Sequence, residues 1–182
     1  MPETNYFDSG AFRRALALGG ARSGKSAFAE RLARGCGVEK VYLATAEPGD
    51  AEMATRIAKH REIRGDDWLT VETPRDLVSQ LQIEDRPDRV ILVDCLTLWL
   101  SNRLLDGADP EADAAALCAT LERMAARVVL ASNEVGLGLV PETPLGRVFR
   151  DAQGRLNQRV AAVCDLAVFM AAGLPMTLKA PR

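Results

Sequence analysis

Short runs of aliphatic residues alternate along this chain with longer segments in which apolar positions recur at helical spacing. The clearest aliphatic runs lie at 15–18, 41–45, 90–93 and 128–132. Runs without a polar face are typical of strands buried on both sides of a parallel sheet. Helical spacing is found at 27–34, 50–64 and 145–163, and again from 110 onward. Shorter strands are expected at 68–71, 167–171 and 176–179, and a short helix at 76–81. The alternation predicts an α/β fold with a mainly parallel sheet flanked by helices.

The length of the chain favours a single domain with one continuous core. It has 182 residues, of which 48% are hydrophobic and 26% are charged, a balance that excludes a disordered or fibrous protein. Residues 1–14 show no period and include Pro2 and Gly10. We therefore expect a flexible N-terminal tail at 1–14 and one domain at 15–182.

Charge and hydropathy exclude several classes of partner. The formal net charge is -2 and no block of Lys or Arg occurs, so we expect neither nucleic acid nor an anionic membrane as a partner. The longest apolar runs are interrupted by Asp94 and Asp165, and the apolar run near the N-terminus is short. This predicts no membrane span and no signal peptide, and therefore a cytoplasmic protein. Four widely spaced cysteines and a single histidine predict reduced thiols rather than a zinc site.

The first aliphatic run leads directly into a phosphate-binding motif, G-x-x-x-x-G-K-S. Glycines allow a tight turn whose backbone N–H groups face a polyphosphate at the start of the following helix. The lysine supplies a positive charge, and the serine hydroxyl is a hard oxygen ligand suited to Mg²⁺. The predicted nucleotide-binding residues of this loop are Gly19, Gly20, Ala21, Arg22, Ser23, Gly24, Lys25 and Ser26.

Polar residues follow the other buried strands and should reach the same edge of the sheet as the phosphate loop. Thr45 ends the second run and Asp94 ends the third. Parallel strands bring their carboxyl ends to one edge, where ligands bind in open α/β sheets. An acid after a buried strand beside a phosphate loop is typical of an Mg²⁺-orienting carboxylate. We therefore predict that Asp94 and Ser26 hold Mg²⁺.

The only histidine, His60, lies in the predicted helix at 50–64. Arg56 and Arg64 are each one turn away, and two guanidinium groups disfavour protonation of an imidazole between them. A neutral ring nitrogen could then act as a nucleophile. The local sequence alone favours the other reading, a half-buried surface histidine on an amphipathic helix.

Together these features resemble the bifunctional adenosylcobinamide kinase / adenosylcobinamide-phosphate guanylyltransferase family of cobalamin biosynthesis. The segment around His60 discriminates this family from generic P-loop kinases, and residues 1–14 have no counterpart in it. The segments that carry the resemblance are 19–26, 41–46, 50–61 with Arg64, and 132–142 continuing through 149–151 and 154–158.

The resemblance implies a RecA-like P-loop NTPase fold, a homotrimer and two successive reactions. ATP or GTP phosphorylates adenosylcobinamide, and GMP is then transferred from GTP through a guanylyl-histidine to adenosylcobinamide phosphate. His60 matches the histidine that is guanylylated in that family. Glu134, which follows the aliphatic run at 128–132, is a candidate base for the kinase step. Nucleotide contacts are implied at Thr45, Arg64, Glu72 and Asp94.

Three alternatives differ in chemistry. A single-activity P-loop kinase for another small substrate would use Lys25, Ser26 and Asp94 without His60. A nucleotide switch is disfavoured because no N-K-x-D motif occurs, and a RecA-type DNA motor is disfavoured by the acidic charge balance.

Overall fold

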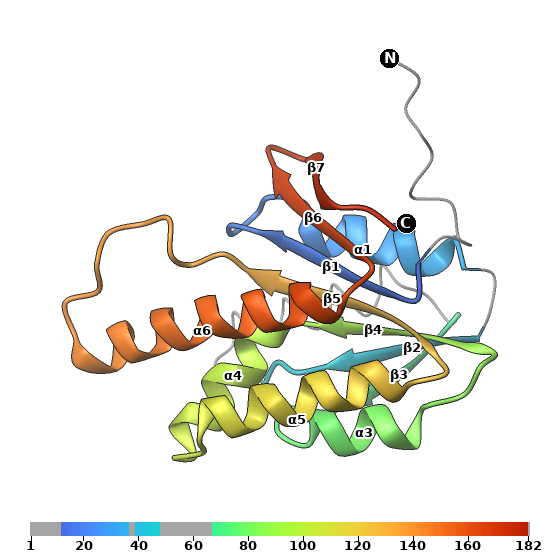
Figure 1. Ribbon diagram of the computed structural model, residues 1–182, viewed down its shortest axis with the longest axis horizontal. Coiled ribbons are helices and arrows are strands. Elements are labelled where there is room, and N and C mark those ends of the chain that lie inside the picture. Colours follow the sequence, from blue (N-terminus) through green and yellow to red (C-terminus); the bar gives the residue numbers. More distant parts are fainter. Residues whose placement is uncertain (1–11, 37–38, 48–66, 182) are drawn as a thin grey trace.

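A mainly parallel sheet with helices on both faces forms the body of the protein (Figure 1). The computed structural model describes residues 12–36, 39–47 and 67–181. In this part of the chain the seven strands lie in the order β3-β2-β4-β5-β1-β6-β7, and β7 runs antiparallel to β6. The strands are β1 (Arg14–Gly19), β2 (Glu39–Ala44), β3 (Trp68–Glu72), β4 (Arg89–Asp94), β5 (Arg127–Asn133), β6 (Leu166–Ala171) and β7 (Leu174–Lys179).

The helices in the described residues match the predicted ones, with one addition. They are α1 (Lys25–Arg34), α3 (Leu77–Ile83), α4 (Leu96–Leu105), α5 (Pro110–Arg123) and α6 (Pro144–Val163). α4 was not expected as a helix, because the apolar residues that crowd its first half, Leu96, Leu98, Trp99 and Leu100, hide a helical period. The predicted helix at 50–64 lies outside the described residues. The α/β fold with a mainly parallel sheet is confirmed.

The two faces of the sheet are covered differently (Figure 1). One face carries α1, and the other carries α3, α4, α5 and α6. Alternation along β1 explains this difference: Leu16 and Leu18 point into the core beneath the four helices, whereas Ala15 and Ala17 point toward α1. The small alanine side chains leave room for Phe28 of α1. The phosphate-loop helix can therefore lie close against the strand that precedes it.

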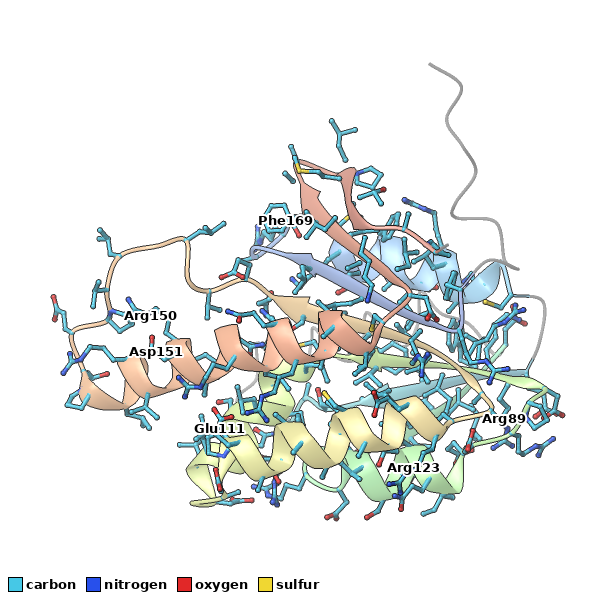
Figure 2. The ribbon with its side chains drawn as sticks, viewed as in Figure 1. Arg89, Glu111, Arg123, Arg150, Asp151 and Phe169 are labelled. Atoms are coloured by element: carbon cyan, nitrogen blue, oxygen red, sulfur yellow. The ribbon has the colours of Figure 1, made fainter. Side chains whose placement is uncertain are left out.

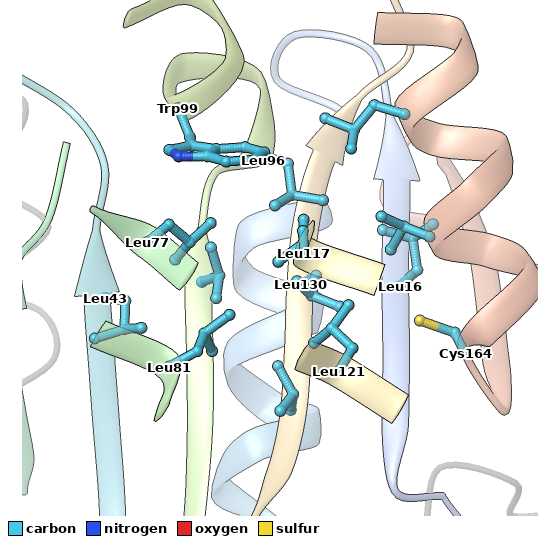
Figure 3. Close-up of a cluster of buried hydrophobic side chains, with 14 of the residues drawn as sticks. Leu16, Leu43, Leu77, Leu81, Leu96, Trp99, Leu117, Leu121, Leu130 and Cys164 are labelled. Carbon is cyan, nitrogen blue, oxygen red and sulfur yellow. The ribbon is translucent and has the colours of Figure 1, made fainter. Parts of the chain in front are cut away.

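Most of the large buried side chains lie beneath the four-helix face (Figure 3). Leu16 and Leu130 come from neighbouring strands, and Leu96, Trp99 and Leu121 come from the helices that cover them. All five are at most 1% exposed. Truncating one such leucine to alanine costs about 2–5 kcal/mol, because the cavity is only partly refilled.

The helices that cover this face are capped and cross-linked at the surface. Asp109 caps α5, with its Oδ1 accepting from the Glu111 N–H at 2.9 Å, and Pro110 occupies the first helical position. The Glu111 carboxylate also forms ion pairs with Arg155 and Arg159 of α6, each at 2.5 Å. Figure 2 shows Glu111 on the side of α5 that faces α6. Exposed ion pairs of this kind contribute about 0–1 kcal/mol each. They fix the relative position of α5 and α6 more than they stabilise the fold.

The domain begins before residue 15. Phe12 is buried, and the backbone N–H groups of Arg13 and Arg14 each donate to Asp165 Oδ2 at 2.9 Å. Arg14 is the first residue of β1. The predicted tail at 1–14 is therefore too long at its C-terminal end, because the buried phenyl ring and the Asp165 carboxylate anchor residues 12–14. Residues 1–11 lie outside the described residues.

Within the part of the chain that the structure describes, no helix is long and apolar enough to cross a membrane.

All four cysteines are free thiols; Cys36, Cys95 and Cys164 are buried, and Cys118 is half-buried.

Candidate active site

The segment between β1 and α1 forms a compact loop whose backbone requires glycine at two positions. Gly24 has a φ of 93° and ends the loop directly before α1. A Cβ on Gly19 would lie 2.5 Å from Ser23 Oγ and 2.7 Å from the Met170 carbonyl oxygen. The first and last glycines of the motif are therefore set by a close approach and by a left-handed conformation.

The turn between β6 and β7 supports the phosphate loop from outside. The Gly173 N–H donates to the Ser23 carbonyl at 3.0 Å. A Cβ on Gly24 would meet Gly173 Cα at 3.3 Å. β6 lies directly beside β1, with Gly19 opposite Met170. The antiparallel hairpin thus holds the loop in place although it lies about 150 residues further along the chain.

Lys25 and Ser26 begin α1 and face the carboxyl end of the sheet. Lys25 is buried, and its Nζ donates to the Gly20 carbonyl at 3.2 Å, so the side chain folds back across the loop. The Ser26 hydroxyl lies 3.4 Å from Asp94 Oδ1. The structure therefore brings together the loop serine and the strand-end carboxylate, which are 68 residues apart in the sequence.

The second oxygen of Asp94 has a partner that the sequence did not reveal. The Tyr42 hydroxyl donates to Asp94 Oδ2 at 3.0 Å. Tyr42 lies on β2 opposite Leu92, two residues before Asp94 on the neighbouring strand, so both side chains occupy the same face. Alternate residues of a strand share one face, so the sequence could have indicated this contact, but only if β2 and β4 were already known to be neighbours.

Thr45 is fully buried and its hydroxyl is used within the protein. Its Oγ1 donates to the Cys95 carbonyl at 2.7 Å and accepts from the Cys95 N–H at 2.8 Å. The Thr45 carbonyl in turn accepts from Asn102 of α4, which also donates to the Pro74 carbonyl, both at 3.0 Å. Thr45 and Asn102 thus join the ends of β2, β3 and β4. The predicted nucleotide contact at Thr45 stays a prediction.

Glu134 and Glu72 lie at the same edge, on opposite sides of Asp94 in the strand order. Glu134 follows β5, donates its N–H to the Gly19 carbonyl at 3.2 Å, and accepts from the Gly136 N–H through Oε1 at 2.7 Å. Glu72 ends β3, is exposed, and lies opposite Ala44 of β2. Glu134 therefore adjoins the phosphate loop, whereas β2, β4 and β5 lie between Glu72 and β1.

The two remaining predicted site residues, His60 and Arg64, lie outside the described residues. Their roles stay predictions.

The thiol next to Asp94 does not compete as a nucleophile. Burial raises the pKa of the Cys95 thiol to about 11, and the negative charge of Asp94 acts in the same direction. The thiol is therefore protonated at neutral pH. Among the residues that the structure describes, no group of three or more His, Cys, Asp or Glu side chains could hold a metal ion. Any cation here would depend on the Ser26 and Asp94 oxygens together with ligand or water oxygens.

Comparison with known families gives this site its context. The family model described as cobinamide kinase / cobinamide phosphate guanyltransferase, CobU, matches residues 15–178. The chain belongs to this family.

Two curated proteins illustrate how far similarity to other CobU-family proteins extends. The bifunctional adenosylcobalamin biosynthesis protein CobP of Pseudomonas aeruginosa is 48% identical over 168 residues, which are 91% of this chain and 97% of that protein. The protein of the same description named CobU from Escherichia coli is 38% identical over an alignment of 179 residues that covers 90% of this chain and 98% of that protein. The similarity therefore covers nearly the full length of both relatives.

Solved structures of other proteins share the fold of this CobU-family chain. The flagellar accessory protein FlaH from Methanocaldococcus jannaschii superposes with a TM-score of 0.57 at 14% identity, covering 92% of this chain and 78% of that one. A second solved structure, an ATPase domain, gives a TM-score of 0.51 at 15% identity, covering 86% of this chain and 68% of that one. These structural similarities confirm the predicted P-loop NTPase fold. They give no information about the activity of this chain.

Proposed function

We propose that this protein is a bifunctional enzyme that phosphorylates adenosylcobinamide with ATP or GTP and then transfers GMP from GTP to adenosylcobinamide phosphate, giving adenosyl-GDP-cobinamide. The observation that carries the proposal is the match to the CobU family over residues 15–178. The meeting of Lys25, Ser26 and Asp94 at one edge of the sheet supports it, because phosphoryl transfer needs these groups together. A single-activity kinase is disfavoured, since the family description includes both activities.

In the kinase step the substrate hydroxyl oxygen attacks the γ-phosphorus, and the bond from that phosphorus to the β,γ-bridging oxygen breaks. Loop N–H groups and the Lys25 ammonium stabilise the negative charge of the transferring group. Nucleotide contacts are proposed for the loop residues 19–26 and, along the same edge, for Thr45, Glu72 and Asp94, with Arg64 contributing from outside the described residues.

Ser26 and Asp94 fit a magnesium ion bound with the nucleotide. Their oxygens approach to 3.4 Å, and a hydroxyl with a carboxylate is a donor set that Mg²⁺ accepts. When bound, Mg²⁺ would neutralise charge on the terminal phosphates. The protein's own part is to hold the Asp94 carboxylate and the Ser26 hydroxyl at the start of α1.

Glu134 is the proposed base of the kinase step. It follows β5 directly beside Gly19, and its carboxylate is half-buried at the same edge as the loop. The proton of the substrate hydroxyl passes to this carboxylate as the oxygen attacks. The Gly136 N–H that donates to Oε1 fixes the side chain in place.

In the second step a neutral ring nitrogen of His60 attacks the α-phosphorus of GTP, and pyrophosphate leaves. A phosphate oxygen of adenosylcobinamide phosphate then attacks the same phosphorus, and the P–N bond breaks to regenerate the imidazole. A phosphoramidate to histidine suits this role because it is reactive and temporary.

Labelling with GTP that carries ³²P on its α-phosphate tests the second step. After denaturation, wild-type protein should retain label that acid removes and alkali does not, and His60→Ala should retain none. His60→Ala should keep kinase activity measured with γ-labelled nucleotide, whereas Lys25→Ala should lose it. Wild-type protein that is active as a kinase but never labelled would establish the single-activity alternative.

We further propose that three copies assemble into a homotrimer. Exposed apolar side chains gather on the segment after β5 and on the start of α6, where a second copy of the chain could cover them. This apolar β5–α6 surface consists of Leu137, Leu139, Val140, Leu145 and Val148.

Sedimentation velocity tests the assembly. Wild-type protein should sediment as a trimer and Leu139→Asp as a smaller species. Leu69→Asp, at an exposed leucine on β3 away from this surface, should leave the mass unchanged. A monomeric wild type, or a trimeric Leu139→Asp, argues against the assignment.

The four free thiols support a cytoplasmic location, where thiols stay reduced.

A further inference from the structure

We propose that Tyr42 is a positioning residue whose hydroxyl holds the Asp94 carboxylate in the orientation that presents its other oxygen to Ser26. The inference rests on the proposed function of Asp94 as an Mg²⁺-binding carboxylate. It adds a residue on β2 that the phosphate-loop motif does not contain.

The two Asp94 oxygens have different neighbours. Oδ2 accepts from the Tyr42 hydroxyl at 3.0 Å, and Oδ1 lies 3.4 Å from Ser26 Oγ. A carboxylate at a strand end can rotate about its terminal torsion, which is broad rather than locked in one staggered well. The hydrogen bond from Tyr42 removes this freedom, because rotation would separate Oδ2 from the hydroxyl. Oδ1 is then directed toward the start of α1.

Packing of its ring holds Tyr42 independently of Asp94. The side chain is buried, and the Tyr42 and Trp68 rings meet edge to face, with centroids 6.1 Å apart and planes at 89°. The Arg34 guanidinium carbon lies 5.6 Å from the centroid of the Trp68 ring. The position of the hydroxyl is thus fixed by the packing of Tyr42 of β2 against Trp68 of β3, which in turn contacts Arg34 of α1. A donor fixed in this way orients its acceptor instead of following it.

A hydrogen-bond partner behind a metal-binding carboxylate commonly changes metal affinity by about 10–100-fold when it is removed. Tyr42→Phe keeps the ring and its contact with Trp68 and deletes only the oxygen. We expect the Kd for the cation to rise about tenfold. If Tyr42 served only to fill the core, the same substitution would leave the cation affinity unchanged.

The experiment measures binding of Mn²⁺, as a paramagnetic probe for Mg²⁺, by electron paramagnetic resonance with saturating β,γ-imido-GTP. Tyr42→Phe should raise the Kd for Mn²⁺ about tenfold. Thr120→Val is the matched control: it also removes a buried hydroxyl, but one that pairs with Gln82 between α3 and α5. Thermal unfolding of both variants provides a comparison of stability.

A second pair of variants separates this inference from the function on which it rests. Asp94→Asn and Ser26→Ala should both weaken Mn²⁺ binding. If neither does, the proposed metal site is wrong. If Asp94→Asn weakens binding but Tyr42→Phe binds as the wild type does, only the positioning role is overturned.

Trp68→Phe keeps the test decisive if Tyr42→Phe does not fold. It retains the Tyr42 hydroxyl but reduces the ring surface that holds it, so it should raise the Kd in the same direction by a smaller factor. Wild-type affinity in a folded Trp68→Phe protein would contradict the role of the aromatic pair.

Discussion

Replacing Thr45 with valine should cost the protein a substantial part of its stability, although the two side chains have nearly the same shape. The hydroxyl makes two hydrogen bonds to the Cys95 backbone, at 2.7 and 2.8 Å, and the side chain is fully buried. Valine restores the volume and neither bond. The cost is therefore that of the Cys95 N–H left without a partner and of one lost bond to the Cys95 carbonyl, which still accepts from the Trp99 N–H at 3.2 Å; no cavity contributes.

The magnitude follows from these contacts. Leaving the Cys95 N–H buried and unpaired costs about 1–3 kcal/mol, and losing the bond to its carbonyl costs about 1 kcal/mol more. The added methyl group returns about 0.8 kcal/mol by its burial. The net expectation is about 1–3 kcal/mol, which for a domain of this size lowers Tm by about 2–12 °C.

Urea unfolding of the wild type and the variant, fitted with a common slope of unfolding free energy against urea concentration, measures this difference in stability. Thr45→Ser is the matched control, because it keeps the hydroxyl and loses only a methyl group, at a cost of about 1 kcal/mol. A Thr45→Val protein within about 0.5 kcal/mol of the wild type would refute the reasoning, since surface substitutions commonly change stability by that much.

Three other predictions follow from individual side chains. Gly19→Ala should abolish binding of a fluorescent GTP analogue, whereas Gly20→Ala, whose added Cβ meets nothing within 4 Å, should bind nearly as the wild type does; equal binding by both would contradict the steric argument. Burial raises the pKa of Asp165, but the hydrogen bonds from Arg14 and Arg13 and the Arg14 charge outweigh it and lower the pKa below 3.8. Asp165→Asn should therefore be less stable than the wild type in urea at pH 7, with the difference closing below about pH 4 as the wild-type carboxyl protonates, and a constant difference at all pH values would contradict this. Burial raises the pKa of the Cys164 thiol to about 12, so iodoacetamide at pH 7.5 should modify the half-buried Cys118 first in native protein, as peptide mass spectrometry can establish, and earlier modification of Cys164 would contradict it.

The sequence predicts the parts of the site that local chemistry specifies. The glycine positions, Lys25 and Ser26 follow from the motif, and Asp94 follows from an acid after an aliphatic run. The strands of a parallel sheet bring their carboxyl ends to one edge, so the contact between Ser26 and Asp94 could be expected from the sequence alone.

The supporting residues could not be predicted in the same way, because their partners depend on strand order. Tyr42 reads as one more buried residue until β2 is known to lie beside β4. Asn102 lies among other polar residues in the second half of α4, and its two acceptors come from other loops. The site needs contacts between elements whose adjacency no local pattern encodes.

The support of the phosphate loop by the β6–β7 turn has a consequence for the timing of synthesis. The ribosome makes the chain from its N-terminus, so the loop at 19–26 emerges before Gly173, which donates to Ser23 and lies about 150 residues later. A nascent chain that ends before β6 lacks both the neighbour of β1 and this hydrogen bond. The support of the phosphate loop is thus complete only after β6 and the turn that follows it have been made.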